Sequence, residues 1–154
     1  MPPSNPSTEH DDPERGSAAL EFILVGLILL VPLVYLVVAL GLIQTQSLGA
    51  EAGARHIART VSLAPDAATA RVGADRVLAS VVDEYGIDAG SVDLAMECVP
   101  AGSLCPEAGS TVIVTVRTRV SLPLVPPVLG LDRLASIPVE ASAAQKVSRF
   151  WGSE

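Results

Sequence analysis

The sequence predicts an α+β protein anchored in a membrane, and three features support that prediction. Residues 22–43 form an almost unbroken apolar run without a charged side chain. Residues 65–85 repeat apolar side chains every three or four positions, which is typical of an amphipathic helix. From residue 91 onward, apolar and polar side chains alternate in three stretches, as in half-buried strands. We therefore expect a long transmembrane and stalk helix, a second amphipathic helix and a small antiparallel sheet of about three strands.

The composition argues against several classes of function. The chain has 154 residues and a formal net charge of -7, and its Lys and Arg residues form no basic stripe, so nucleic acid is not an expected partner. Ala and Val are abundant and aromatic residues are scarce, which suits close helix packing more than a pocket for a ligand. The sequence contains no evident nucleophile with a base, phosphate-binding loop or metal-ligand cluster. We therefore expect no enzyme activity, cofactor, metal or small-molecule substrate.

The amino-terminal part divides into a polar leader and an apolar span. Residues 1–16 are rich in Pro and acidic side chains and have almost nothing apolar to bury, so we expect this segment to be disordered. Residues 22–43 would form a helix about 33 Å long, which is enough to cross a bilayer. The run is longer than the apolar core of an ordinary secretory signal, and its start is acidic rather than basic. The chain therefore either keeps an uncleaved anchor or is cut ahead of the span.

Gly16, Glu21 and Phe22 open the apolar run with a distinctive spacing. Four residues separate Gly16 from Glu21, and Phe22 leads directly into the span. This arrangement resembles the processing site of type IV pilin-like proteins, in the short-leader form of the TadE-like pseudopilins of tight-adherence pili. The resemblance implies cleavage between Gly16 and Ser17 by a prepilin peptidase on the cytoplasmic side of the membrane. Glu21 would then be the fifth residue of a chain that begins at Ser17.

Glu21 lies at the edge of the hydrocarbon, where a carboxylate is costly unless it meets a partner. Cleavage would create one, because the new α-amino group of Ser17 is a cation at the head of the helix. In filaments of the family that the chain resembles, this Glu is taken to pair with the amino terminus of a neighbouring subunit. A low dielectric strengthens such a pair, which can then fix the register between packed helices. The alternative is that Glu21 stays in the interface and only favours the helix start electrostatically.

Residues 44–64 contain no helix breaker, so we expect the transmembrane helix to continue into water as a stalk. Gly49 and Gly53 form a Gly-x-x-x-Gly pair, which is a weak signal for specific helix contact because Glu51 lies between them. His56 is expected to be a solvated residue on this stalk rather than a metal ligand. Four apolar residues occur at near-helical spacing: Leu48, Ala54, Ile57 and Val61.

The second helix begins after Ala64, at Pro65 and Asp66, and Gly86 ends it. Its predicted apolar face consists of Ala70, Ala74, Val77, Val81 and Tyr85. Asp83 and Glu84 are adjacent and point apart on a helix, so we interpret them as part of a solvated face rather than as an acid and base pair.

Two half-buried strands follow, and the chain's only two cysteines lie between their apolar stretches. Val92, Leu94 and Met96 form the inner side of the first strand, and Val112, Val114, Val116 and Val120 that of the second. Cys98 and Cys105 are separated by six residues that include Pro and Gly, which can bring the two sulfurs together. Zinc would need four ligands, and a redox pair would more often be Cys-x-x-Cys. We therefore expect a structural disulfide, which places this part of the chain outside the cytoplasm.

Residues 121–134 are apolar but irregular, and their prolines exclude a central strand. We expect this loop to fold back and cap the core, with an exposed patch for a partner or the membrane surface as the alternative. Residues 137–143 alternate again as a third strand, which Pro138 places at a sheet edge. The tail, residues 145–154, either docks or frays.

Two features set the expected orientation, and charge counting opposes them. Cleavage by the peptidase and formation of a disulfide both require residues 1–16 in the cytoplasm and residues 44–154 outside. The distribution of positive charge favours the reverse, because only Arg15 precedes the span whereas Arg55 and Arg59 follow it. With so few charges, we give more weight to the motif and the cysteines, which are independent of each other.

These features predict three regions: a leader at residues 1–16, a helix at 17–64 with its span at 22–43, and an extracytoplasmic α+β head at 65–154. The resemblance implies a minor pseudopilin, or pilus assembly protein, in the cytoplasmic membrane, because the major pilins of these pili are much shorter. The partners it implies are a prepilin peptidase, other pilins and pseudopilins, the inner-membrane assembly platform and membrane lipid. One alternative is a single-pass envelope protein whose head binds a partner without entering a filament. A more distant alternative is an extracytoplasmic enzyme.

Overall fold

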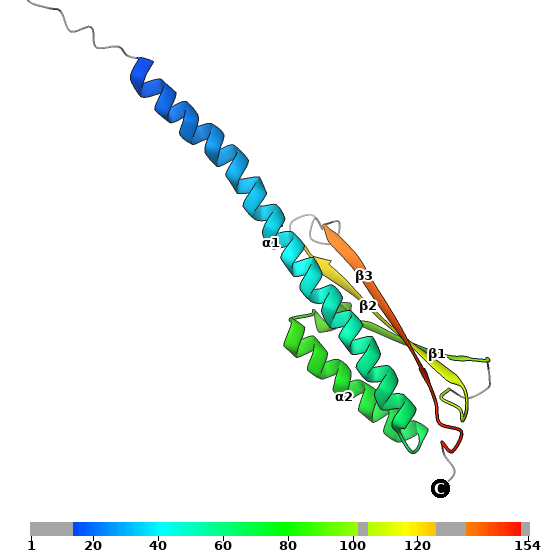
Figure 1. The fold of residues 1–154 in the computed structure, drawn as a ribbon. Coiled ribbons are helices and arrows are strands. Elements are labelled where there is room, and N and C mark those ends of the chain that lie inside the picture. Colours follow the sequence, from blue (N-terminus) through cyan, green and yellow to red (C-terminus); the bar gives the residue numbers. More distant parts are fainter. Residues whose placement is uncertain (1–13, 102–104, 126–134, 152–154) are drawn as a thin grey trace, which may run out of the picture. The chain divides into compact units, whose positions relative to one another are not determined.

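The computed structural model describes residues 14–101, 105–125 and 135–151. Its elements are, in chain order, helix α1 (Glu14–Leu63), helix α2 (Ala67–Tyr85), the short 3-10 helix η1 (Ala89–Ser91), and strands β1 (Asp93–Val99), β2 (Thr111–Ser121) and β3 (Ser136–Lys146). The strands form one antiparallel sheet in the order β1-β2-β3 (Figure 1). Together with the disulfide between Cys98 and Cys105, these elements confirm the predicted α+β fold class. Residues 1–13 of the leader, which was expected to be disordered, lie outside the described ranges. Residues 14–16 of the leader are instead the first residues of α1.

The chain divides into two compact units, residues 1–38 and residues 39–154. We call the second unit the head. It begins earlier than residue 65, where the sequence analysis placed it, because the carboxy-terminal half of α1 is the central helix of the head and not a free stalk. The α1 residues in the head core are Ala50, Ala54, Ile57, Ala58 and Val61, all of them almost fully buried. Leu48, which was expected in the same stripe, is instead exposed.

The sheet buries one face against the two helices (Figure 1). Four valines of β2 are at most 1% exposed: Val112, Val114, Val116 and Val120. The residues next to each of them in the sequence face the other side of the sheet. Apolar side chains of the flanking strands lie beside them, since Val116 pairs with Leu94 of β1 and with Ala141 of β3. The predicted alternation therefore describes the sheet correctly.

Helix α2 has a defined cap at each end. The Asp66 carboxylate accepts hydrogen bonds from the Thr69 backbone N–H at 2.8 Å and from the Thr69 hydroxyl at 2.9 Å. These bonds lower the pKa of Asp66 below its usual value, the bond from the backbone N–H contributing most. At the other end, Gly86 has a left-handed backbone with φ of 61°. Both ends lie where the sequence predicts them.

Glycines allow α1 to approach α2 closely. A Cβ atom built on Gly49 would lie 2.7 Å from Cγ and 2.8 Å from Cβ of Tyr85. A Cβ built on Gly53 would lie 3.4 Å from Val81, which is an ordinary contact. On α2, a Cβ at Gly73 would lie 2.7 Å from Cγ2 of Thr60. The Gly-x-x-x-Gly pair therefore takes part in helix packing within the chain, with α2 as the partner.

The structure describes the two ends of the connection between β2 and β3, residues 122–125 and residue 135. The Leu122 backbone N–H donates to the Ala135 carbonyl at 3.2 Å, which closes the base of the connection. Leu122, Pro123 and Val125 are half-buried, which by itself does not test the expectation that this loop caps the core. Leu124 is 89% exposed and therefore does not fit that expectation. Residues 126–134 of this loop lie outside the described ranges.

The carboxy-terminal segment docks on the head through residue 151. Val147 is 1% exposed, and its backbone N–H donates to the Ser110 carbonyl at 2.9 Å. Trp151 is half-buried and packs against the core. The tail was expected either to dock on the head or to fray, and its described part, residues 145–151, docks.

The contact between Gly49 and Tyr85 gives a testable prediction about stability. We expect Gly49→Ala to lower the free energy of unfolding of the head by about 1–3 kcal/mol, because the new methyl group overlaps the root of the Tyr85 side chain. Gly53→Ala is the matched control on the same helix and should be neutral or stabilising, since there is space for the methyl group and Ala favours a helix. Urea denaturation of the detergent-solubilised protein, followed by circular dichroism, measures both. Equal stability of the two variants would contradict the packing.

Candidate functional site

The amino-terminal part of α1 exposes apolar side chains on all sides. Between Leu20 and Leu42, its large apolar side chains are 39–81% exposed, with Phe22 at the upper limit. A core helix of a soluble protein would be mostly buried, whereas the most apolar window of this helix is 6% buried. The helix is long and apolar enough to cross a membrane.

Glu21 lies at the start of this apolar surface. Four apolar side chains line a shallow depression around it: Leu20, Ile23, Leu24 and Leu27. Among the residues that the structure describes, Glu21 has no hydrogen-bond or ion-pair partner. A carboxylate in such apolar surroundings is stable in lipid only if a cation or hydrogen-bond donor from elsewhere reaches it.

Gly16 and Ser17 lie in the first turn of α1, which begins at Glu14. The N–H groups of a first turn have no partner within the helix, and helix ends fray. The backbone around the peptide bond between these two residues is therefore easier to unwind than backbone deeper in the helix. Ser17 precedes Glu21 by four residues, or about one turn.

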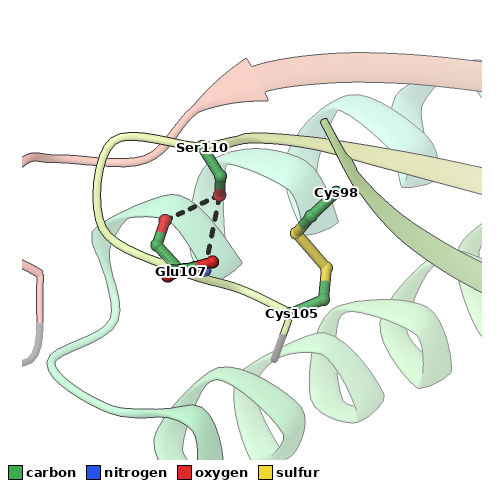
Figure 2. Close-up of a disulfide and its surroundings, with 4 residues drawn as sticks. All are labelled: Cys98, Cys105, Glu107 and Ser110. Atoms are coloured by element: carbon green, nitrogen blue, oxygen red, sulfur yellow. Dashed lines mark hydrogen bonds between the residues drawn. A yellow bond between two sulfur atoms is a disulfide. The ribbon is translucent and has the colours of Figure 1, made fainter. Parts of the chain in front are cut away.

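The disulfide ties the connection between β1 and β2 to the end of β1. The Cα atoms of Cys98 and Cys105 are 5.7 Å apart (Figure 2). Cys98 packs partly against the core, whereas Cys105 is exposed. Beyond Cys105, the Ser110 hydroxyl donates to the Glu107 carbonyl at 2.6 Å and closes the turn that leads into β2. The structure thus confirms the expected pairing of the two cysteines.

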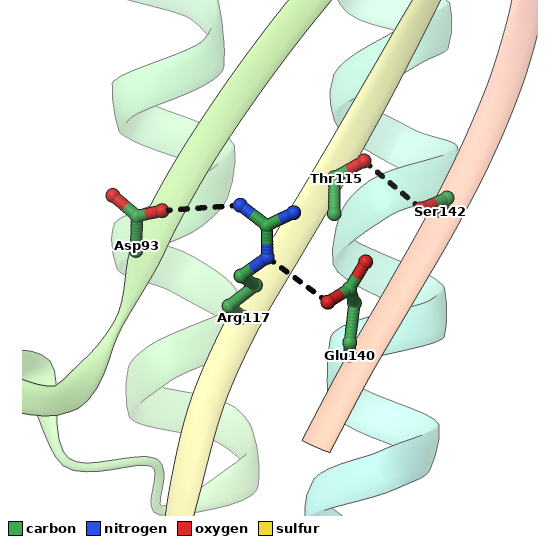
Figure 3. Close-up of polar contacts among 5 residues, drawn as sticks. All are labelled: Asp93, Thr115, Arg117, Glu140 and Ser142. Atoms are coloured by element: carbon green, nitrogen blue, oxygen red, sulfur yellow. Dashed lines mark hydrogen bonds and ion pairs between the residues drawn. The ribbon is translucent and has the colours of Figure 1, made fainter. Parts of the chain in front are cut away.

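The outer face of the sheet carries a charged row that the sequence analysis did not predict. Arg117 Nε donates to Glu140 at 2.9 Å, and a second guanidinium nitrogen lies 3.8 Å from Asp93 (Figure 3). The hydrogen bond with Glu140, followed by the charge of that carboxylate, raises the pKa of Arg117. The signal for this row is the strand register, which places Asp93 and Glu140 opposite Arg117. Because these side chains are about half exposed, the ion pairs mainly keep this face polar and add little stability.

The other residues considered for chemistry lie apart. His56 is on the exposed side of α1, and Asp83 and Glu84 are on the exposed side of α2. Within the described ranges, no three His, Cys, Asp or Glu side chains are grouped as metal ligands. The candidate site therefore consists of Gly16, Ser17, Glu21 and Phe22 at the head of the exposed apolar helix.

Comparison of the chain with models of protein families, with curated proteins and with solved structures finds no match.

The disulfide gives a prediction for the folded head. Replacing both cysteines, Cys98→Ala with Cys105→Ala, should lower the free energy of unfolding by about 2 kcal/mol, because the unfolded chain loses a small covalent loop. Reductant should destabilise the unchanged protein by a similar amount and leave the double variant unaffected. Thiol labelling of the folded protein from its native envelope gives the direct test. Labelling of both cysteines without reductant would show that the bond does not form there.

Proposed function

We propose that this protein is a TadE-like minor pseudopilin that assists assembly of a tight-adherence pilus. In this proposal α1 anchors the chain in the cytoplasmic membrane, and a prepilin peptidase removes residues 1–16. The amino terminus faces the cytoplasm and the head lies outside. Glu21 then pairs with the α-amino group of Ser17 on a neighbouring subunit.

One observation carries the proposal: Glu21, a carboxylate without a partner among the described residues, stands where an exposed apolar helix begins, five residues after Gly16. A helix that only anchored a protein would need no acid at this point, since an isolated carboxylate weakens insertion into lipid. A cation created at Ser17 by cleavage explains both the acid and the glycine before it. The first-turn position of the Gly16–Ser17 bond is compatible with access by a peptidase.

The head supports the extracytoplasmic part of the proposal. Disulfides persist in oxidising compartments, so the bond between Cys98 and Cys105 favours a head outside the cytoplasm. The outer face of the sheet carries Arg117 with its two carboxylate partners, and such a face is suited to water. Filament contacts through α1 would leave this face free.

The processing step predicts a defined amino terminus. Intact mass measurement of the protein extracted from membranes should give the mass of residues 17–154 in cells that contain the peptidase. Cells without the peptidase should yield the full chain, and Gly16→Leu should do so in both strains because the bulky side chain blocks the cleavage position. A full-length chain in peptidase-containing cells would falsify the pseudopilin proposal and favour a single-pass anchored protein.

The pairing role predicts that cleavage and assembly can be separated. Glu21→Ala should still be cleaved, yet its incorporation into pili should fall by at least about tenfold, since loss of one partner of a buried ion pair leaves the other charge unpaired. Glu51→Ala is the control on the same helix, because Glu51 is exposed and pairs with Arg55 within the head. Immunoblots of sheared pili and membranes measure the distribution. Equal piliation by the two variants would remove the pairing role.

A further inference from the structure

The apolar run of α1 contains a single side chain that can form a hydrogen bond, that of Tyr35. All other residues from Phe22 to Ile43 are apolar, and none of them is Ser, Thr, Asn, Gln or His. Tyr35 is half-buried, and its hydroxyl has no hydrogen-bond partner among the described residues. A hydroxyl without a partner is costly in hydrocarbon, so Tyr35 needs an acceptor from elsewhere if α1 lies in lipid.

Pro32 leaves a backbone acceptor unpaired in the same run. It lies inside α1 and has no N–H, so the Ile28 carbonyl lacks its usual donor four residues further on. In membrane helices, Ser or Thr side chains, water or a neighbouring helix satisfy such carbonyls. This run has no Ser or Thr, and Pro32 lies about 15 Å from the nearer end of the run, so water is distant. A neighbouring helix is the remaining source of a donor.

The unpaired donor and the unpaired acceptor share a face of α1 and a depth in the membrane. Ile28 and Tyr35 are seven residues apart, which places them about 20° apart around the helix. The Ile28 carbonyl points along the axis to the level of residue 32, where its donor would be. The side chain of a helical Tyr leans toward the amino terminus and covers the preceding turn, so the Tyr35 hydroxyl lies near this same level. Within the chain, however, the hydroxyl makes no hydrogen bond to this carbonyl.

A parallel second copy of α1 supplies the group that each helix lacks. Two copies with the same orientation in a membrane hold the same residues at the same depth. When they meet about a two-fold axis, each Tyr35 hydroxyl can reach the Ile28 carbonyl of the other helix. The face is open to such contact, because Leu24, Ile28 and Val31 are 58–61% exposed.

We propose that α1 pairs in parallel with a second copy of this chain, and that the Tyr35 hydroxyl of each copy donates to the Ile28 carbonyl of the other. The contact face consists of Leu24, Ile28, Val31 and Tyr35. The contact rests on the membrane span of the proposed function but does not require cleavage after Gly16.

This face of α1 also includes Glu21 of the candidate site. Glu21 precedes Ile28 by seven residues, and Ser17 precedes Glu21 by four, so both lie on the same side of the helix. One parallel pair of helices therefore brings the Tyr35 contact and the amino-terminal site of two copies to a common seam. The hydrogen bonds of Tyr35 set the relative depth at which the two amino termini meet.

Self-association of the uncleaved chain tests the hydrogen bond. The full chain is purified from a host without the peptidase or other pilins, so Ser17 has no free amino group. Sedimentation equilibrium in detergent micelles measures the dimer Kd. We expect Tyr35→Phe, which removes only the hydroxyl, to raise the Kd about sevenfold through the loss of two interhelical hydrogen bonds of average strength. Adding Leu36→Tyr to this variant turns the hydroxyl about 100° around the helix and should not restore the Kd.

A double-mutant cycle with Pro32 identifies the acceptor. Pro32→Ala supplies an N–H to the Ile28 carbonyl, so the Tyr35 hydroxyl loses its acceptor. On this background we expect Tyr35→Phe to change the Kd by less than about twofold, because the two changes remove the same interaction. A sevenfold effect on both backgrounds would refute Ile28 as the acceptor, and an unchanged Kd on the natural background would refute the hydrogen bond.

Cysteine crosslinking in membranes identifies the face and the partner. Val31→Cys lies on the proposed face, and Leu33→Cys is the matched control, since residue 33 is almost at the same depth but about 160° around the helix. Val31 and Leu33 are 58% and 57% exposed, and the natural cysteines are already paired with each other. Mild oxidation should join two copies of the Val31→Cys variant and few of the Leu33→Cys variant.

The outcomes separate this contact from the proposed function. Equal crosslinking of the Val31→Cys and Leu33→Cys variants refutes the paired face and leaves the anchor and the cleavage untouched. A Val31→Cys product whose mass differs from that of two chains assigns the face to another protein and refutes the second copy. Release of the chain from membranes by alkaline extraction would remove the span itself, and the contact with it.

Discussion

The close contact of α1 with α2 and the sheet is the interaction on which the head depends. Alanines line the buried side of α1 together with Ile57 and Val61, and Gly49 lets the helix reach Tyr85 without a Cβ between them. The same helix continues, without a break in secondary structure, into a segment whose apolar side chains are exposed on every side. The composition of α1 therefore changes along its length. Leu, Ile and Val predominate before the head, and small residues are common within the head.

The remainder of the head offers little apolar surface for association within the described residues. The outer sheet face is polar around Arg117, and the edge strand β3 carries Pro138 and ends at Lys146, both of which disfavour pairing with another strand. Exposed large apolar residues outside the amino-terminal part of α1 are few within the described residues, and two of them, Leu63 and Val72, line a shallow depression between α1 and α2. The extended apolar surface of α1 is thus the part of the described chain best suited to contacts with lipid or with other helices.

Periodicity and local chemistry account for most of what the sequence predicts correctly. The ends of α2, the alternation in β2 and the disulfide all depend on residues close together in the chain, so they are visible without a structure. The role of residues 44–64 is not visible in the sequence, because a stripe of small residues has the same pattern on an exposed stalk and on a core helix. Only the structure shows that other elements of the head pack against this stripe. The charged row around Arg117 likewise depends on strand register. At the candidate site, the spacing of Gly16 and Glu21 is visible in the sequence, whereas the function proposed for them involves a peptidase and a second subunit, which a single chain does not contain.

The position of the boundary between Val38 and Ala39 decides how a water-soluble fragment has to be made. A fragment that starts at residue 65 would lack the central helix and would expose the valine face of β2, which should drive aggregation. A fragment that starts near residue 44 keeps the core helix while omitting the apolar anchor. For crystallisation or labelled NMR samples, the helix that contains the candidate membrane span has to be divided along its length and cannot be removed whole.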